Sequence, residues 1–379
     1  MENKSVMGSA QQDVHPAPAE YGVVSQINKK IPVAVLAATG SVGQRFVQLL
    51  DGHPWFEVVA LSGSDRSAGG AYGEVCHWVL DSTMPAWARE MQVLPSDPEL
   101  IRTPLVFSAL PSGVAKGVEP EFAQAGSLVC SNASAYRQAP DVPILFPEVN
   151  PEHTRALQVQ RQKRGWRGGI VTNSNCTSTG LSVALKALQD AFGLRRVFVV
   201  SMQALSGAGY PGVPSLDIID NVIPYIPGEE EKVEIEARKI LGSFDGESLR
   251  PADFAISAHT NRVAVSDGHM VALSVECEAA VDPERAVEAL CAYQAPQISR
   301  ELPSAPQPVI VVRAEPDRPQ PRLDRMAGKG MATVVGRVRE DPIFDLKMVV
   351  LSHNTIRGAA GGSLFNAELL VKQGWLPEG

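Results

Sequence analysis

Cysteine is scarce in this sequence, with five among 379 residues. No two of them form a Cys-x-x-Cys pair, their spacing is not that of a zinc site, and one is left over if the other four pair. These absences argue against a disulfide-rich scaffold, and we expect no metal site. A reduced intracellular protein is the simplest interpretation. The five residues are Cys76, Cys130, Cys176, Cys277 and Cys291.

Long apolar runs and an excess of positive charge are also missing. No run approaches the roughly 20 apolar residues that cross a bilayer, so we expect no membrane partner. The 34 Lys and Arg residues are outnumbered by 42 Asp and Glu residues. The resulting net charge of -8 argues against a general nucleic-acid binder. With 44% hydrophobic and 20% charged residues, we expect a soluble, cytoplasmic protein.

The first 30 residues lack the apolar core of a secretory signal and are rich in polar residues, Pro and Ala. We expect residues 1–30 to form a flexible extension. Glu2, Asp13 and Glu20 make a transit peptide a weaker interpretation, because such leaders contain few acidic residues.

Apolar runs alternate with helical patterns in the first half of the chain. Residues 32–37 read as a strand, followed by a tight turn and a helix. Further strands are predicted at 58–61, 105–109 and 128–130, which favours a parallel, doubly wound sheet of the Rossmann type. From Cys176 onwards the pattern predicts a second, α+β domain. The fold class is therefore α/β with two domains, as the length also suggests.

A glycine-containing turn follows the first predicted strand. Ala38-x-Gly40-x-x-Gly43 fits a dinucleotide fingerprint with alanine in place of the first glycine. The string alone is weak, and a tight turn without a ligand is the alternative. Its position between strand and helix favours a cofactor, because the helix N-terminus attracts a pyrophosphate.

The second predicted strand ends without the carboxylate that an NAD site usually offers to the ribose. Ser64, Arg66 and Ser67 stand there instead and could bind a 2′-phosphate, which favours NADP over NAD. Asp65 leaves this choice open, and a merely solvated Arg66 is the alternative.

Cys176 lies between a strand-like run at 169–172 and a helix-like run that begins at Thr177. A thiol at a helix N-terminus has a lowered pKa and becomes a nucleophile. The alternative is a buried structural cysteine, which the polar neighbours on both sides make less fitting.

Among the seven histidines, His269 is the best partner for this thiol. Arg262 and His269 bracket a short apolar run, so one extended segment could present a carboxylate clamp and a proton acceptor. An exposed arginine and a structural histidine are the alternative. Earlier in the chain, residues 160–167 are unusually basic and are predicted to be a solvated loop.

Several motifs in one order resemble the aspartate-semialdehyde dehydrogenase family, in the branch typical of archaea and fungi. The resemblance covers nearly the whole chain after the extension. The motifs are TGSVG (39–43), SNASAYR (131–137), NSNCT (173–177), QALSGAG (203–209), GEEEK (228–232), RVAVSDGH (262–269) and NTIRGAAG (354–361).

The resemblance implies reductive dephosphorylation of L-aspartyl 4-phosphate to L-aspartate 4-semialdehyde with NADPH. This step belongs to the biosynthesis of lysine and diaminopimelate, threonine, methionine and isoleucine. Cys176 would form a thioester, His269 would act as general acid and base, and Gln203 would orient the substrate.

The resemblance also implies residues that bind substrate and phosphate. Arg262 would bind the α-carboxylate and Glu229 the amino group. Lys232, Arg137 and Asn132 would meet the phosphate. Without the resemblance, Glu229 and Lys232 would read as an ordinary charged helix surface.

The resemblance implies NADP(H) as the cofactor. The residues that would bind it lie in the turn after the first predicted strand, at the end of the second predicted strand and in two later loops. The resemblance divides the chain into residues 31–173, completed by a C-terminal helix at 354–379, and a catalytic and dimerisation domain at 174–353. It also implies a homodimer or homotetramer. The cofactor residues are Thr39, Gly40, Ser41, Val42, Gly43, Ser64, Arg66, Ser67, Ser206, Gly207, Asn354 and Gly358.

Three other functions remain possible on the same scaffold. Malonyl-CoA reductase would use Cys176 and His269 but has no substrate amino group for Glu229 to hold. N-acetyl-glutamyl-phosphate reductase is disfavoured by the paired motifs around Glu229 and Arg262. A catalytically silent nucleotide sensor would not need Cys176, Gln203 and His269 together.

Overall fold

The computed structural model describes residues 29–376. Most of the predicted N-terminal extension, and the last three residues of the predicted C-terminal segment at 354–379, therefore lie outside the described residues. Within the described part, no helix is long and apolar enough to cross a membrane.

The first half of the chain builds a sheet of six strands in the order β3-β2-β1-β4-β5-β6. Every pair in it is parallel, as the sequence predicted. The order reverses between β1 and β4, and ligands of such sheets bind at the carboxyl ends of the strands near this point. The strands are β1 (Ile31–Leu36), β2 (Phe56–Ser62), β3 (Val93–Leu94), β4 (Leu105–Ser108), β5 (Leu128–Ser131) and β6 (Gly169–Thr172).

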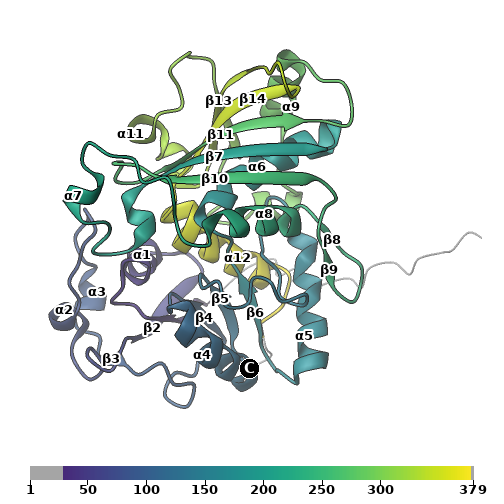
Figure 1. Ribbon diagram of the computed structural model, residues 1–379. Coiled ribbons are helices and arrows are strands. Elements are labelled where there is room, and N and C mark those ends of the chain that lie inside the picture. The colour runs from purple at the N-terminus through teal and green to yellow at the C-terminus, as the bar shows by residue number, and fades with distance from the viewer. Residues whose placement is uncertain (1–28, 377–379) are drawn as a thin grey trace, which may run out of the picture.

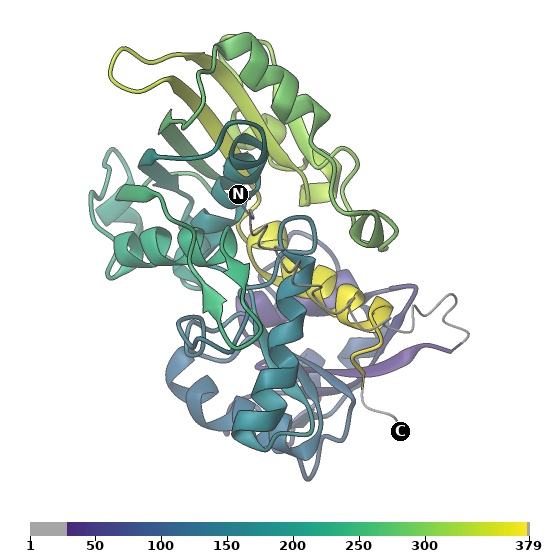
Figure 2. The ribbon, with the colours of Figure 1, turned by 90° about the vertical axis from the view of Figure 1, so that its right-hand side faces the viewer.

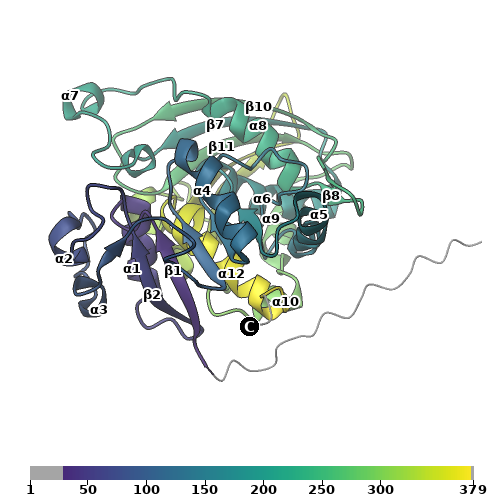
Figure 3. The same ribbon diagram turned by 90° about the horizontal axis from the view of Figure 1, so that it is seen from below.

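Helices cover both faces of this sheet. Successive side chains of a strand point to opposite faces, and here apolar side chains lie on both faces. Val33, Leu105 and Leu128 belong to a buried cluster on the face of α1 (Ser41–Leu50). Ala34, Val106 and Val129 belong to the cluster on the face of α4 (Ser112–Ala125). Figure 3 shows α1 and α4 beside these strands. Helix α5 (Ala156–Arg164) packs against β6.

The last helix, α12 (Gly361–Lys372), returns to the first sheet. Its side chains Leu364, Phe365 and Leu369 join the cluster around Val33. Residues 361–371 are all buried, and the polar ones among them are paired: Asn366 donates to Asn173, and Glu368 binds His53 and Ser304. Figure 2 shows this helix, in yellow, among elements of the first half of the chain.

A second, mixed sheet has the order β10-β7-β11-β14-β13-β12. Figure 1 shows α6 (Cys176–Phe192) and α8 (Glu229–Ile240) below it, and α9 (Pro283–Ala292) packs on β12 and β13. Alternate residues of β7 and β11 are buried beneath these helices, and those between them are partly exposed. The strands are β7 (Arg196–Gln203), β10 (Ala255–Arg262), β11 (His269–Glu276), β12 (Ile310–Arg313), β13 (Thr333–Glu340) and β14 (Leu346–Ser352).

Short elements connect these layers. A two-stranded sheet joins β8 (Ser243–Phe244) to β9 (Leu249–Arg250). The π-helix η4 (Ile356–Ala360) leads into α12. The short α-helices are α2 (Tyr72–Val75), α3 (Ala86–Arg89), α7 (Ser215–Ile218), α10 (Gln297–Arg300) and α11 (Pro321–Asp324), and the 3₁₀ turns are η1 (Pro151–Arg155), η2 (Leu205–Ala208) and η3 (Ala327–Gly330).

The prediction of a solvated loop at residues 160–167 is wrong. Most of this segment is the end of α5, and its arginines bind their own chain. Arg164 makes two hydrogen bonds to Asp141, and Arg161 donates to the carbonyl oxygen of Gly168. Charge density alone did not reveal these partners, because they come from distant segments.

We expect Gly43→Ala to lower the free energy of unfolding by about 1–3 kcal/mol, the usual cost of overpacking. An added Cβ would lie 2.2 Å from the carbonyl oxygen of Ala37 and 2.6 Å from Cα of Ala38, where α1 crosses β1. Gly117→Ala is the matched control, because nothing lies within 4 Å of its Cβ position in α4. Gly117→Ala should raise the free energy of unfolding by about 0.5–1 kcal/mol. Urea unfolding measures both, and equal stability of the two variants would contradict the packing argument.

Candidate active site

The thiol of Cys176 lies at the first residue of α6, as the sequence predicted. Asn175 caps this helix: its Oδ1 accepts from the backbone N–H of Thr177 at 2.7 Å and of Ser178 at 3.3 Å. An asparagine at this position satisfies helix N–H groups that have no partner within the helix. Cys176 keeps a partly exposed edge, whereas Cys76, Cys130 and Cys277 are buried.

The imidazole of His269 faces this thiol. Sγ of Cys176 and Nε2 of His269 are 3.1 Å apart. On the other side of the ring, the backbone N–H of Ala204 donates to Nδ1 at 3.0 Å. Because Nδ1 accepts, the proton of the neutral ring belongs to Nε2, which therefore donates towards the sulfur. The sequence-predicted pair is brought together by α6 and β11.

Burial sets the protonation of this pair. It raises the pKa of the Cys176 thiol to about 12, and the charge of Glu229 adds to the effect while Arg137 and Arg262 oppose it. Burial also lowers the pKa of His269 to about 3, helped by Arg262. The expected lowering of the thiol pKa by the helix N-terminus is thus wrong for the free protein, because desolvation outweighs the helix field. At neutral pH the resting pair is a neutral thiol beside a neutral imidazole.

Arg262 and His269 do not lie on one extended segment, contrary to the sequence expectation. Arg262 ends β10 and His269 begins β11, and both strands pair with β7. Gln203, at the end of β7, is the register partner of Arg262. The three side chains meet because the ends of β7 and β10 and the start of β11 lie at the same edge of the sheet.

Gly207 lies directly against two of these side chains. A Cβ at this position would be 2.8 Å from Nη1 of Arg262 and 2.9 Å from Nε2 of His269. Nη1 of Arg262 also donates to the carbonyl oxygen of Ala204 at 2.7 Å. Only glycine therefore allows the backbone to close over the arginine and the imidazole.

Glu229 turns into the site from the first residue of α8. Its Oε1 accepts from Nδ2 of Asn175 at 2.5 Å and from Nε2 of Gln203 at 3.1 Å. Lys232 lies 3.6 Å from its other oxygen. The neighbouring Glu230 instead accepts from the backbone N–H of Thr260 in β10. The geometry thus brings Glu229, and not Glu230, to the thiol.

Arg137 and Asn132 approach from the loop after β5. Nη2 of Arg137 donates to the carbonyl oxygen of Asn132 at 2.7 Å, and Nη1 meets Glu236 at 3.0 Å. Nε of Arg137 is buried and has no hydrogen-bond partner, and the two bonds use only two of the five N–H donors of the guanidinium. The side chain of Asn132 accepts from Asn173 at 2.8 Å, so Asn132 also ties this loop to the end of β6.

The first turn leaves the N-terminus of α1 open. Gly40 is the N-cap residue and offers no side chain, so the N–H groups of Ser41, Val42 and Gly43 lie in an uncapped first turn. Thr39 precedes it, and its carbonyl oxygen accepts from Gln44. Such an end suits an anion, as a pyrophosphate-binding turn requires.

Two later segments place the remaining predicted cofactor residues beside the thiol. A Cβ on Gly358 would lie 3.0 Å from Cβ of Cys176. Asn354 donates to Oγ of Ser206 at 2.7 Å and accepts from the N–H of Gly268 at 2.8 Å. The loop of Ser206 and Gly207 is thereby tied to the segment that carries Gly358.

The turn after β2 brings together only part of the predicted phosphate group. Ser64 and Arg66 are exposed. Ser67 is buried, and its hydroxyl donates to the carbonyl oxygen of Ser64 at 3.0 Å. Its side chain fills the space beside Gly63, which explains why the structure turns it inwards. Ser67 thus shapes this turn and does not present its hydroxyl to a ligand.

Two residues around the thiol were missed from the sequence. Asn175 contacts Glu229 and caps α6, and an asparagine directly before a helix is a recognisable cap signal. Glu236 accepts from the N–H of Asn175 at 2.5 Å, and its spacing of seven from Glu229 places both on one face of α8. Within residues 29–376, no group of three or more His, Cys, Asp or Glu side chains could hold a metal ion.

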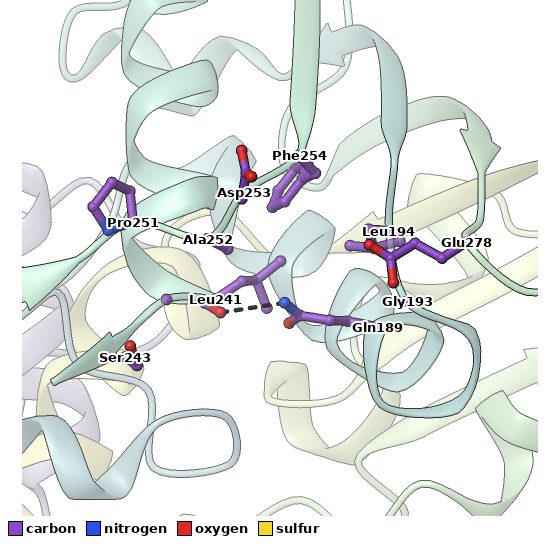
Figure 4. Close-up of a pocket in the computed structure, with 11 residues that line it drawn as sticks. Gln189, Gly193, Leu194, Leu241, Ser243, Pro251, Ala252, Asp253, Phe254 and Glu278 are labelled. Carbon is purple, nitrogen blue, oxygen red and sulfur yellow. Dashed lines mark hydrogen bonds between the residues drawn. The ribbon is translucent and has the colours of Figure 1, made fainter. Parts of the chain in front are cut away.

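A separate cavity of about 530 Å³ lies at the far end of α6 (Figure 4). Gln189, Gly193, Asp253 and Glu278 are among its lining residues. Gln189 is 13 residues along α6 from Cys176, which corresponds to about 20 Å of helix. Neither a cysteine nor a histidine lines the cavity, whereas the thiol and the imidazole meet at Cys176, so that junction is the candidate active site.

We expect the alkylation rate of Cys176 by iodoacetamide to rise about tenfold per pH unit between pH 6 and 9. With a thiol pKa near 12, each unit below it changes the thiolate fraction tenfold, and an imidazole of pKa near 3 stays neutral throughout. Peptide mass spectrometry in a Cys291→Ser background removes the exposed competing thiol. A plateau below pH 8 would instead indicate a stable thiolate–imidazolium pair.

Comparison with known proteins agrees with this geometry. Residues 32–157 match the family model of the semialdehyde dehydrogenase NAD binding domain, and residues 185–357 match that of the semialdehyde dehydrogenase dimerisation domain. The chain is 54% identical to aspartate-semialdehyde dehydrogenase of Archaeoglobus fulgidus, over 90% of this chain and 98% of that protein. Identity to the Schizosaccharomyces pombe enzyme is 47%, over 90% and 98%.

A solved relative has the same architecture. The crystal structure of aspartate semialdehyde dehydrogenase with NADP from Candida albicans superposes with a TM-score of 0.84 at 41% identity, covering 92% of this chain and all of the other. Archaeal and fungal relatives at this identity and coverage confirm the predicted resemblance and the two-part α/β fold. The chain belongs to the aspartate-semialdehyde dehydrogenase family of oxidoreductases.

Proposed function

We propose that this chain catalyses the NADPH-dependent reductive dephosphorylation of L-aspartyl 4-phosphate to L-aspartate 4-semialdehyde, with release of phosphate. The observation that carries the proposal is the 3.1 Å contact between the Cys176 thiol and the His269 imidazole at the N-terminus of α6. Around it lie an amide, a carboxylate and three cationic side chains, which match the charges of an aminoacyl phosphate.

In the first step, Sγ of Cys176 attacks the acyl carbon and forms a thioester. The bond between that carbon and the phosphate oxygen breaks, and the thiol proton leaves with the phosphate. Bound NADPH supplies the hydride that reduces the thioester. The resulting tetrahedral alkoxide collapses to the aldehyde and returns the electron pair to Sγ, so the nucleophile is restored.

His269 serves both steps from one side of the reacting carbon. Nε2–H donates towards Sγ and stabilises negative charge on the sulfur as the thiolate forms. The same donor lies beside the oxygen that becomes an alkoxide. Its low pKa keeps the resting ring neutral, with the proton on Nε2, from where it can be donated as an acid. Gln203 lies next to Glu229 and would orient the acyl group.

The substrate's own charges fit three sets of side chains. Arg262, at the end of β10, would bind the α-carboxylate through its guanidinium. Glu229 would hold the amino group. Lys232, Arg137 and Asn132 would bind the phosphate, to which the guanidinium of Arg137 can offer N–H donors that Glu236 and the Asn132 carbonyl do not use.

We further propose that residues 31–173 and the C-terminal segment 354–379 hold NADP(H), and that residues 174–353 carry catalysis and dimerisation. The turn at 39–43 would hold the pyrophosphate on the N-terminus of α1. Ser64 and Arg66 would meet the 2′-phosphate, and Ser206, Gly207, Asn354 and Gly358 would meet the nicotinamide side.

The partly exposed face of the mixed sheet is the surface we propose for subunit contact. Phe198, Val200 and Met202 of β7 and Ala272 of β11 lie on this face with half-buried side chains. A match to a dimerisation domain supports a homodimer or homotetramer built on it. A cytoplasmic location and a role in synthesis of the aspartate-derived amino acids complete the proposal.

We expect purified protein to reduce NADP when given L-aspartate semialdehyde and phosphate, and Cys176→Ala to lose this activity at least 10⁴-fold. The nucleophile is removed while the fold is kept, since alanine fits the same site. The assay is the absorbance of NADPH, repeated with malonyl-CoA and NADPH. Turnover of the thioester alone would support the malonyl-CoA reductase alternative, and inactivity in both assays would support the nucleotide sensor.

Glu229→Gln should reduce kcat/KM for the semialdehyde about 10²-fold, because the amino group loses its charge partner. Initial rates at saturating phosphate and NADP measure the change. Glu230→Gln is the matched control, since Glu230 faces β10. Equal losses in the two variants would argue against Glu229 as the partner of the amino group.

A further inference from the structure

One face of α8 carries four charged residues, Glu229, Lys232, Glu236 and Lys239, at spacings that place them in a row. Such a row is ordinarily solvated, yet Glu236 is 2% exposed and Lys239 is 8% exposed. Buried charges are costly unless they are paired. The first two residues of the row are placed at the substrate by the proposed function, and the last two have no role so far.

Glu236 joins two parts of the site with one carboxylate. Its Oε1 accepts from Nη1 of Arg137 at 3.0 Å, and its Oε2 accepts from the backbone N–H of Asn175 at 2.5 Å. Asn175 is the residue directly before Cys176, and Arg137 is a proposed phosphate ligand. Each oxygen therefore accepts one hydrogen bond, and the two donors come from different segments of the site.

The side chain of Lys239 holds the loop that carries Arg137 by binding the backbone of that loop. Its Nζ donates to the carbonyl oxygens of Arg137, Ala139 and Val142 at 2.6–2.7 Å. With Nη2 of Arg137 on the carbonyl oxygen of Asn132, the guanidinium is held at two nitrogens and its Nε has no partner. The arginine is therefore oriented before any ligand arrives.

We propose that Glu236 is a positioning residue that holds the guanidinium of Arg137 at a fixed distance from the thiol of Cys176. Glu236 itself touches neither substrate nor cofactor. It sets where the phosphate is held relative to the attacking sulfur, because one rigid carboxylate binds both the phosphate ligand and the turn of the nucleophile. This inference rests on the proposed function, since it concerns the phosphate site of that reaction.

Glutamine is an informative replacement because it can keep only half of this bridge. Arg137 and the N–H of Asn175 are both donors, and a glutamine side chain offers one acceptor oxygen and one NH₂ group. The NH₂ group would face one of the two donors. The volume is preserved, so the change tests the bridge and leaves packing intact.

The test uses the full chain in the direction that consumes semialdehyde, phosphate and NADP. Glu236→Gln should raise the KM for phosphate at least tenfold and change the KM for semialdehyde less than threefold, because the semialdehyde is bound by Arg262 and Glu229. Glu234→Gln is the matched control on the same helix. Glu234 accepts from a backbone N–H of Ala258 in β10, so both KM values should stay within twofold of wild type.

A double-mutant cycle asks whether Glu236 acts through Arg137. Arg137→Met should raise the phosphate KM, and adding Glu236→Gln to it should raise this KM less than threefold further. Glu236→Asp retains the charge on a shorter side chain and should give a phosphate KM between wild type and Glu236→Gln. This variant also serves if the glutamine variant does not fold.

The outcomes separate the two proposals. Inactive wild-type protein would overturn the proposed function. Active wild type, with an unchanged phosphate KM in Glu236→Gln or with equal rises in both KM values, would overturn the positioning role. In Glu236→Asp, equal rises in both KM values would do the same.

Discussion

The active-site junction depends on Asn175. Its Oδ1 caps α6, its Nδ2 donates to Glu229 and its backbone N–H donates to Glu236. These contacts connect the first turn of α6 with the first residue of α8 and with a residue two turns farther along the same face. They fix the orientation of Cys176 at the start of α6, and hence the 3.1 Å contact between its Sγ and Nε2 of His269. Both the base and the substrate ligands are placed relative to this one residue.

Burial then determines what the placed groups can do. A thiol with a raised pKa and an imidazole with a lowered pKa leave the free site without a reactive thiolate. Arg137 and Arg262 oppose the rise in the thiol pKa, and Glu229 promotes it. After burial itself, the negative charge of Glu229 is what opposes the thiolate most, and a substrate whose ammonium group pairs with Glu229 would offset that charge. Activation of Cys176 and recognition of the amino group are then one electrostatic event.

The sequence predicted the parallel sheet and the start of α6, because each has a local signal, whereas substrate residues such as Glu229 and Lys232 were expected only from the family resemblance. Apolar runs mark the strands, and the polar residues before Thr177 mark a helix N-terminus. The placement of Arg262 and His269 on separate strands could not be predicted in this way, because it depends on β7 pairing with both. The prediction of a lowered thiol pKa was wrong for a related reason. Local sequence reveals the end of the helix but not how deeply that end is buried. Arg161 and Arg164 of α5 likewise have partners, in Trp375 and Asp141, that only the fold brings near.

The charge balance of the site favours an aminoacyl phosphate over a thioester. Arg137, Lys232 and Arg262 supply three cations, and Glu229 and Glu236 supply two anions. Aspartyl phosphate brings a carboxylate, an ammonium group and a phosphate, each of which meets an opposite charge here. Malonyl-CoA brings one carboxylate to the reacting end, so Glu229 would have no ligand cation and Arg137 would have no phosphate for its unpartnered Nε. A bound thioester would displace water from the Glu229 carboxylate without adding a cation to the one that Lys232 supplies, and burying a poorly compensated charge weakens binding. The same groups that make the site costly when empty therefore select the substrate that neutralises them.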